Sequence, residues 1–208
     1  MIWGRPGLKD TSCRDGNERC QTDRMGQSQS RIRSKARVAA DSNDLIEIRE
    51  PKYFSGWFGG YTISASDKWL VMELVDDNVW QLEGFVCVRL RDVTRIRTQG
   101  EFSRSALRHF GIERPSATPA LNAESTKSLV DSAAKIFPVL GIQCVTNKSE
   151  GLWFGTEVTV RNGKLKMRLI SPKRKLRKKS TSFALSSITL IQFGGRYEQV
   201  LAALHTPD

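Results

Sequence analysis

An internal repeat constrains the fold of this chain more than any other feature. When the sequence is shifted by 95 positions, residues 60–107 align with residues 155–202 without a gap. The alignment contains 8 identities among 48 positions, a weak score by itself, but expected strands, turns and a final helix fall at the same places in both copies. Two copies of one small β-rich unit are therefore predicted. The identical pairs are Gly60/Gly155, Leu70/Leu165, Met72/Met167, Leu74/Leu169, Leu90/Leu185, Thr94/Thr189, Ile96/Ile191 and Gly100/Gly195.

Short apolar or alternating runs bounded by turn residues predict five strands in each copy. In the first copy we expect strands at 44–50, 61–65, 69–75, 85–90 and 93–98, followed by a helix at 101–110. In the second copy we expect a helix at 124–137, strands at 142–146, 156–160, 164–170, 182–185 and 188–193, and a helix at 196–204. Asn162-Gly163 lies between two alternating runs, which strongly indicates a hairpin.

Residues 1–43 are predicted to be a disordered basic tail, because they show neither a helical nor a strand period. A related hypothesis is that the working protein begins near Val38. Pro115 and Pro119 mark residues 113–123 as a linker, so the expected domains are 44–112 and 124–205.

The glycine-flanked aromatic pairs Trp57-Phe58 and Trp153-Phe154, and the tight corner Leu90-Arg-Asp-Val-Thr94, carry a resemblance to a known fold. The plan resembles the Sm-like branch of the SH3-like barrels, and uncharacterised bacterial proteins with a similar corner. The resemblance implies a mainly β protein with two tandem small antiparallel barrels and short flanking helices.

The resemblance does not extend to the uridine pocket of Sm proteins. Val71 and Lys166 stand near the position of the base-reading Asn, and the last corner is Arg91-Asp92 or Ser186-Ser187 rather than a basic residue with glycine. Fold resemblance alone therefore gives no reason to expect RNA binding.

The net charge of +11 is concentrated in two parts of the chain. Residues 1–40 carry +5, residues 41–116 carry −2 and residues 117–208 carry +8. In the last segment, alternating cations on a strand lead into a basic run, which we expect to lie in the connection between the second and third strands of the second copy. The candidate nucleic-acid-binding residues are Lys164, Lys166, Arg168, Lys173, Arg174, Lys175, Arg177, Lys178 and Lys179.

Such a run can neutralise phosphates without sequence preference, and the alternative is a solvated loop at a hairpin tip. The paired aromatic residues could stack on bases, but core packing is the more common role of rings in small barrels. Trp80, in a polar loop, is the better candidate for an exposed contact.

The sequence contains no recognisable catalytic motif. His109 and His205 lie near expected helix ends, and Cys13, Cys20, Cys87 and Cys144 lack the spacing of a zinc site. We therefore expect no catalysis, metal or cofactor, and we expect no membrane span and a cytoplasmic location. The predicted function is a non-catalytic module that binds RNA or DNA through the basic face of the second barrel. The alternative is a protein-interaction or assembly module that forms homo-oligomers through barrel edges.

Overall fold

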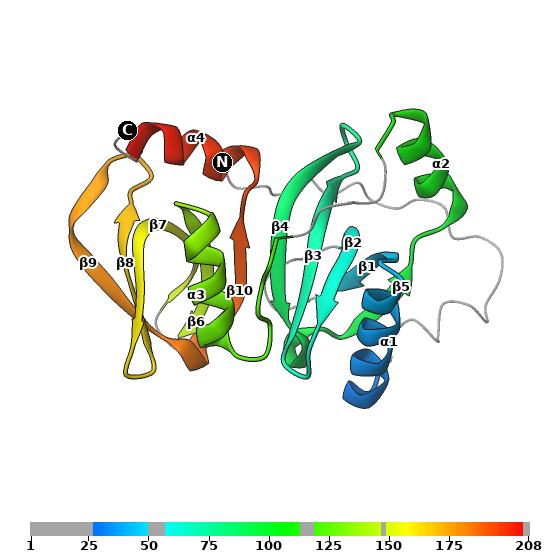
Figure 1. Cartoon of the computed structure of the whole chain (residues 1–208), viewed down its shortest axis with the longest axis horizontal. Coiled ribbons are helices and arrows are strands. Elements are labelled where there is room, and N and C mark those ends of the chain that lie inside the picture. Colours follow the sequence, from blue (N-terminus) through cyan, green and yellow to red (C-terminus); the bar gives the residue numbers. More distant parts are fainter. Residues whose placement is uncertain (1–26, 50–56, 113–118, 147–148, 206–208) are drawn as a thin grey trace.

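The computed structural model describes residues 27–49, 57–112, 119–146 and 149–205, apart from the side chains of 145–150 (Figure 1). We call residues 27–112 the first half and residues 119–205 the second half. The described strands are antiparallel and are β1 Leu45–Arg49, β2 Trp57–Ala65, β3 Trp69–Asp76, β4 Gln81–Arg89, β5 Arg95–Thr98, β6 Leu140–Thr146, β7 Ser149–Arg161, β8 Lys164–Ile170, β9 Leu176–Ala184 and β10 Ile188–Phe193. The helices are α1 Gln29–Asp41, α2 Glu101–His109, α3 Thr126–Ile136 and α4 Arg196–His205, with the short 3-10 turns η2 Leu90–Asp92 and η3 Leu185–Ser187.

The ten strands form a single open sheet in the order β5-β1-β2-β3-β4-β10-β6-β7-β8-β9. The mainly β, antiparallel prediction is therefore confirmed, but the prediction of two closed barrels is wrong. On the edge that does not pair with β3, β4 pairs with β10 of the other half, with Val88 opposite Leu190 and Phe85 opposite Phe193. No pairing among the described strands closes either half on itself. Hydrophobic patterns locate strands, but they do not identify the neighbour of each strand edge.

The two halves match element by element. The bounds of β4 and β9 differ by 95 residues at both ends, and so do those of η2 and η3. The helix that precedes the first strand, α1, has its counterpart in α3. The repeat therefore extends further toward the N-terminus than residue 60.

The prediction of a disordered tail is wrong for residues 27–43, which contain α1. Ser28 begins this helix by accepting a hydrogen bond from the Arg31 backbone N–H. The buried residues Ile32, Ala36 and Ala39 recur at helical spacing and pack in the core of the first half. A protein beginning near Val38 would lack two of these three residues. Residues 1–26 of the expected tail lie outside the described residues.

The outer edge of β5 is occupied by a side chain. The Gln27 amide accepts from the Ile96 backbone N–H and donates to the Ile96 carbonyl, each at 3.2 Å. The Lys35 ammonium donates to the same carbonyl at 3.1 Å. The amide thus takes the place that a neighbouring strand would have at this residue.

The middle of the sheet is buried on both faces. On β3, Leu70 and Met72 point into the core of the first half, whereas Trp69 and Val71 point into the core of the second half. Alternation along a strand produces this division. The second core consequently includes side chains from both halves.

Two further contacts join the halves at β4. The Arg89 guanidinium donates to the carbonyls of Ser186 at 2.7 Å and Leu185 at 2.9 Å, and it lies 5.2 Å from the centre of the Trp69 ring. Gly84 has φ +79°, and a Cβ atom at this position would lie only 2.3 Å from the backbone nitrogen of Gly195. Only glycine permits this close approach of the two backbones.

Candidate nucleic-acid interface

Strand β8 places its cations on one face. Leu165, Met167 and Leu169 are buried in the second core, and the alternate residues point away from it. The outward residues are Lys164, Lys166 and Arg168, of which both lysines are exposed and Arg168 is half-buried. The predicted alternation on this strand is therefore confirmed.

The neighbouring strands leave these cations accessible. Lys164 lies between Arg161 of β7 and Ala184 of β9, and Lys166 lies between Thr159 and Ser182. Arg168 lies between Thr156 and Ser180. Arg161 is exposed and adds a fourth cation. We call Arg161, Lys164, Lys166 and Arg168 the basic face.

The charges of the basic face are not equally available. Arg168 forms an ion pair with Glu157 at 2.5 Å and donates through Nε to the Arg177 carbonyl at 3.2 Å. Neither Lys164 nor Lys166 forms an ion pair with another described residue. Arg161 likewise forms no ion pair with another described residue, so Arg161, Lys164 and Lys166 carry the least compensated charge on this face.

The basic run forms a hairpin tip and the start of an edge strand. The Ser171 backbone N–H donates to the Lys175 carbonyl at 2.9 Å, and the Arg174 N–H donates to the Ser171 carbonyl at 2.7 Å, which closes the tip. Strand β9 then begins at Leu176. The prediction that the whole run lies in a connection, with a strand only from residue 182, is therefore wrong. Residues 177–180 of this edge strand are exposed on both faces and need no apolar alternation, so a search for alternating apolar residues does not find this part of the strand.

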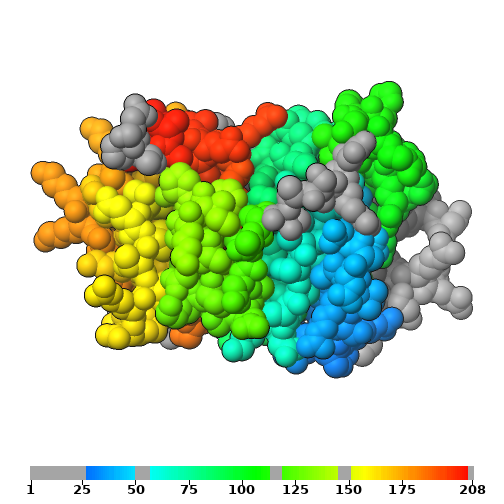
Figure 2. All heavy atoms as spheres, viewed as in Figure 1, coloured from blue at the N-terminus to red at the C-terminus, as the bar shows by residue number. Residues whose placement is uncertain are grey.

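We call Lys173, Arg174, Lys175, Arg177, Lys178 and Lys179 the basic hairpin, and all six are exposed. In the space-filling view, the orange surface that contains β9 and its tip projects from the left end of the molecule (Figure 2). The structure therefore places the basic hairpin beside the basic face at one end of the sheet.

The two aromatic pairs divide between core and surface. Phe58 and Trp153 pack against the two cores, and Trp153 lies 5.5 Å from Phe183. Trp57 instead lies under the Arg97 guanidinium at 4.1 Å, and Phe154 contacts Tyr197. Adjacent residues of a strand face opposite sides, so core packing is correct for only one member of each pair.

Trp80 is distant from the basic residues in the fold. It is half-buried at the β3–β4 tip, where its ring meets Phe102 of α2 edge-on at 6.0 Å. Asp76 and Asp77 belong to the same tip. The acidic surroundings are unsuitable for a phosphate contact, so this candidate does not join the interface.

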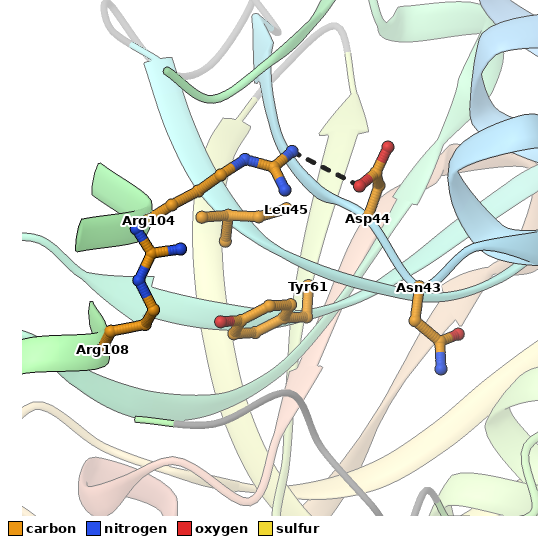
Figure 3. Close-up of a pocket in the computed structure, with 6 residues that line it drawn as sticks. All are labelled: Asn43, Asp44, Leu45, Tyr61, Arg104 and Arg108. Atoms are coloured by element: carbon orange, nitrogen blue, oxygen red, sulfur yellow. Dashed lines mark hydrogen bonds and ion pairs between the residues drawn. The ribbon is translucent and has the colours of Figure 1, made fainter. Parts of the chain in front are cut away.

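A pocket in the first half lies between α2 and strands β1 and β2 (Figure 3). Its lining residues are Asn43, Asp44, Leu45, Tyr61, Arg104 and Arg108. Arg104 pairs with Asp44 at 3.4 Å, and Arg108 pairs with Glu101 at 2.5 Å. The hydrogen bond from Arg108 also holds the pKa of Glu101 below its ordinary value. Because both guanidinium groups have carboxylate partners, this pocket is a weaker anion site than the basic face.

The remaining reactive side chains are dispersed. Cys87 and Cys144 are buried thiols, and burial raises the pKa of Cys144 to about 11. Cys13 and Cys20 lie outside the described residues, and His109 and His205 lie at the ends of α2 and α4. Among residues 27–49, 57–112, 119–146 and 149–205, no three His, Cys, Asp or Glu side chains gather as metal ligands. In the same part of the chain, the helices are too short or too polar to cross a membrane.

Comparisons of the chain with protein-family models, with curated proteins and with solved structures give no match.

Proposed function

We propose that this protein is a non-catalytic module that binds RNA or DNA through the phosphate backbone. The contacts come from the basic hairpin and from Lys164, Lys166 and Arg168 of the basic face. The observation that supports this most strongly is the gathering of accessible cations at one end of the sheet, including two lysines without an ion-pair partner among the described residues.

The geometry suits a polyanion. Alternate residues of a strand are about 6.8 Å apart, so β8 presents a regular row of charges rather than one point charge. Thr159, Ser180 and Ser182 lie beside this row and offer hydroxyl groups that can donate to phosphate oxygens. These are phosphate contacts, so the expected binding has little sequence preference.

The alternative is an assembly module, because β5 and β9 are both terminal strands of the sheet. Three features oppose pairing of β9 with β5 of another copy. Both strands are basic, so they repel each other, and the Gln27 side chain occupies the outer edge of β5 at Ile96. In addition, β9 has Lys179 at the position equivalent to Gly84, the glycine that allows the close backbone approach between β4 and the second half. We therefore expect a monomer in gel filtration, and a concentration-dependent oligomer would favour the alternative.

A salt titration tests the proposal. Binding of the full chain to a mixed pool of RNA and DNA oligonucleotides is measured by fluorescence anisotropy at several salt concentrations. We expect affinity to fall steeply with salt and to be lost when the six residues of the basic hairpin become Ser. The double variant Lys164→Ser/Lys166→Ser should lower the slope of log affinity against log salt by about 1.4 to 1.8, if each lysine contacts one phosphate.

The matched control is Arg31→Ser/Arg33→Ser, which removes two exposed cations from α1 in the first half. This variant has the same change in net charge and should retain most of the affinity. Equal losses in both double variants would mean that net charge rather than the basic face causes binding. Absence of binding at low salt would refute the proposed function.

A further inference from the structure

An aromatic pair lies on the same sheet face as the cations. The rings of Phe154 on β7 and Tyr197 on α4 meet edge to face, with centroids 4.8 Å apart. Phe154 pairs with Gly141 of β6, and a Cβ atom there would lie 2.8 Å from the Phe154 ring. The Phe154 ring therefore lies over Gly141, in space that a side chain at position 141 would otherwise fill.

The strand register places this ring next to the basic face. Gly155 pairs with Leu169, which is buried in the second core, so the residues on either side of Gly155 point outward. These are Phe154 and Thr156, and Thr156 pairs with Arg168. Phe154 and Arg168 are thus diagonal neighbours on one face, a separation of about 7–8 Å that long side chains can span.

The apolar surface continues along α4. Tyr197 is 44% exposed, Val200 51% and Leu204 57%, and their spacing puts them on one side of the helix. In Figure 1, α4 runs across the upper end of the second half, and its C-terminal end lies near the start of β9. An exposed aromatic and aliphatic strip therefore lies beside the cationic end of the sheet.

The first half has the same backbone elements without this combination. Shifting by 95 positions, Phe154 corresponds to Gly59 and Arg168 to Glu73. Only Tyr197 has an aromatic counterpart, Phe102, which is 77% exposed and packs on Trp80. At the positions equivalent to Phe154 and Arg168, the first half therefore has neither an outward ring nor a cation.

We propose that the nucleic acid bound by this protein is single-stranded, with its phosphates on the basic face and unpaired bases against Phe154, Tyr197 and the apolar strip of α4. This inference rests on the proposed function and names its substrate class. Bases in a duplex are stacked inside the helix and cannot reach a side-chain ring, whereas bases of a single strand can. Stacking adds affinity that does not depend on salt, beside the salt-dependent phosphate contacts.

The test compares a single-stranded oligonucleotide of about a dozen nucleotides with a duplex of the same length, a size that suits small β-domain binders. Anisotropy is measured with the full chain and with Tyr197→Ala, Tyr197→Phe and Phe102→Ala. We expect tighter binding of the single strand, and a loss of about tenfold for Tyr197→Ala on that probe only. Tyr197→Phe and the matched control Phe102→Ala should bind as the unchanged protein does.

The double variant Val200→Ser/Leu204→Ser supplies a second measurement, because both side chains are more than half exposed and their replacement leaves the core intact. Circular dichroism checks that each variant is folded. We expect weaker single-strand binding with an unchanged salt slope, since no phosphate contact is removed.

The outcomes separate the two proposals. Equal affinity for both probes, with no effect of Tyr197→Ala, would overturn the single-strand inference and leave the proposed function standing. Absence of binding to either probe would overturn both. Tyr197-dependent binding to vesicles containing anionic phospholipid, without oligonucleotide binding, would instead identify a membrane-surface contact and overturn both.

Discussion

One face of β3–β4, which carries Trp69, Val71 and Cys87, is equivalent to the face of β8–β9 that carries Lys164, Lys166 and Ser182, but the two faces differ in burial. In the first half this face is buried in the second core, and in the second half it is exposed. Six equivalent positions differ in kind, namely Trp69/Lys164, Val71/Lys166, Gly84/Lys179, Phe85/Ser180, Cys87/Ser182 and Arg89/Ala184.

The comparison indicates how one backbone plan can either join a neighbour or end a sheet. Docking needs large apolar side chains, a glycine at the point of closest backbone approach, and a guanidinium that satisfies carbonyls. Burying lysines in their place would cost several kcal/mol for each unpaired charge. The residues of the second half are thus unsuited to docking a third unit in the same way, and they form an exposed, charged surface.

The largest expected effect on the free energy of unfolding comes from the equivalent positions Trp69 and Lys164. Trp69→Ala should reduce the free energy of unfolding by about 3–5 kcal/mol, because it leaves a cavity where a fully buried ring filled the shared core. Lys164→Ala, at the equivalent exposed position, should change it by less than about 0.5 kcal/mol. Urea denaturation measures both values. Similar losses in the two variants would show that the faces are not as different as their burial indicates.

The glycine at the junction should give the next largest effect. Gly84→Ala adds a Cβ atom against the backbone of Gly195 at a left-handed φ, so we expect a loss of about 1–3 kcal/mol in the free energy of unfolding. The matched change Lys179→Ala removes a side chain from an exposed edge and should be nearly neutral. A tolerated Gly84→Ala would mean that β4 and β10 can separate without cost.

The smallest expected effect is on the pH dependence of stability, through Glu198 on α4. Burial raises the pKa of Glu198, whose counterpart in the first half is the non-titrating Ser103. A raised pKa means that the folded state binds the proton more tightly than the unfolded state, so stability from this group is present below about pH 4.5 and is lost as the pH rises through the folded pKa.

Glu198→Gln should therefore gain stability relative to the unchanged protein as the pH rises above about 4.5, because the buried carboxylate of the unchanged protein then loses its proton. Thermal unfolding at matched pH values measures the difference. Ser103→Ala is the control and should show the same pH dependence as the unchanged protein. A stability difference for Glu198→Gln that does not vary with pH would contradict the assignment.

Local chemistry in the sequence was sufficient for some parts of the fold. The hairpin at Asn162-Gly163 forms with φ of +50° and +69°, as the dipeptide predicts. The helix at Glu101–His109 and the outward lysines of β8 also follow from local patterns.

The parts that failed depend on distant contacts. The pairing of β4 with β10 joins residues about a hundred positions apart and is set by complementary surfaces, which periodicity does not report. Helix α1 has only three small or medium apolar anchors among basic residues, so its stability comes from packing on the first core. Phe154 points away from the core while Trp153 packs against it, because the pleat puts adjacent residues of a strand on opposite faces; assigning both rings of a pair to the core therefore predicts only one of them correctly.

The Gln27 amide on Ile96 has a consequence for how this protein behaves at high concentration. A long antiparallel sheet with two bare ends is a template for fibril growth, since each end can recruit the next chain. Here the Gln27 amide occupies the edge of β5 at Ile96, and the exposed lysines and arginine of β9 repel the same strand of a second chain. Replacing Gln27 with an apolar residue would therefore remove the side-chain partner of the Ile96 N–H and leave this position on the β5 edge open to pairing with another chain.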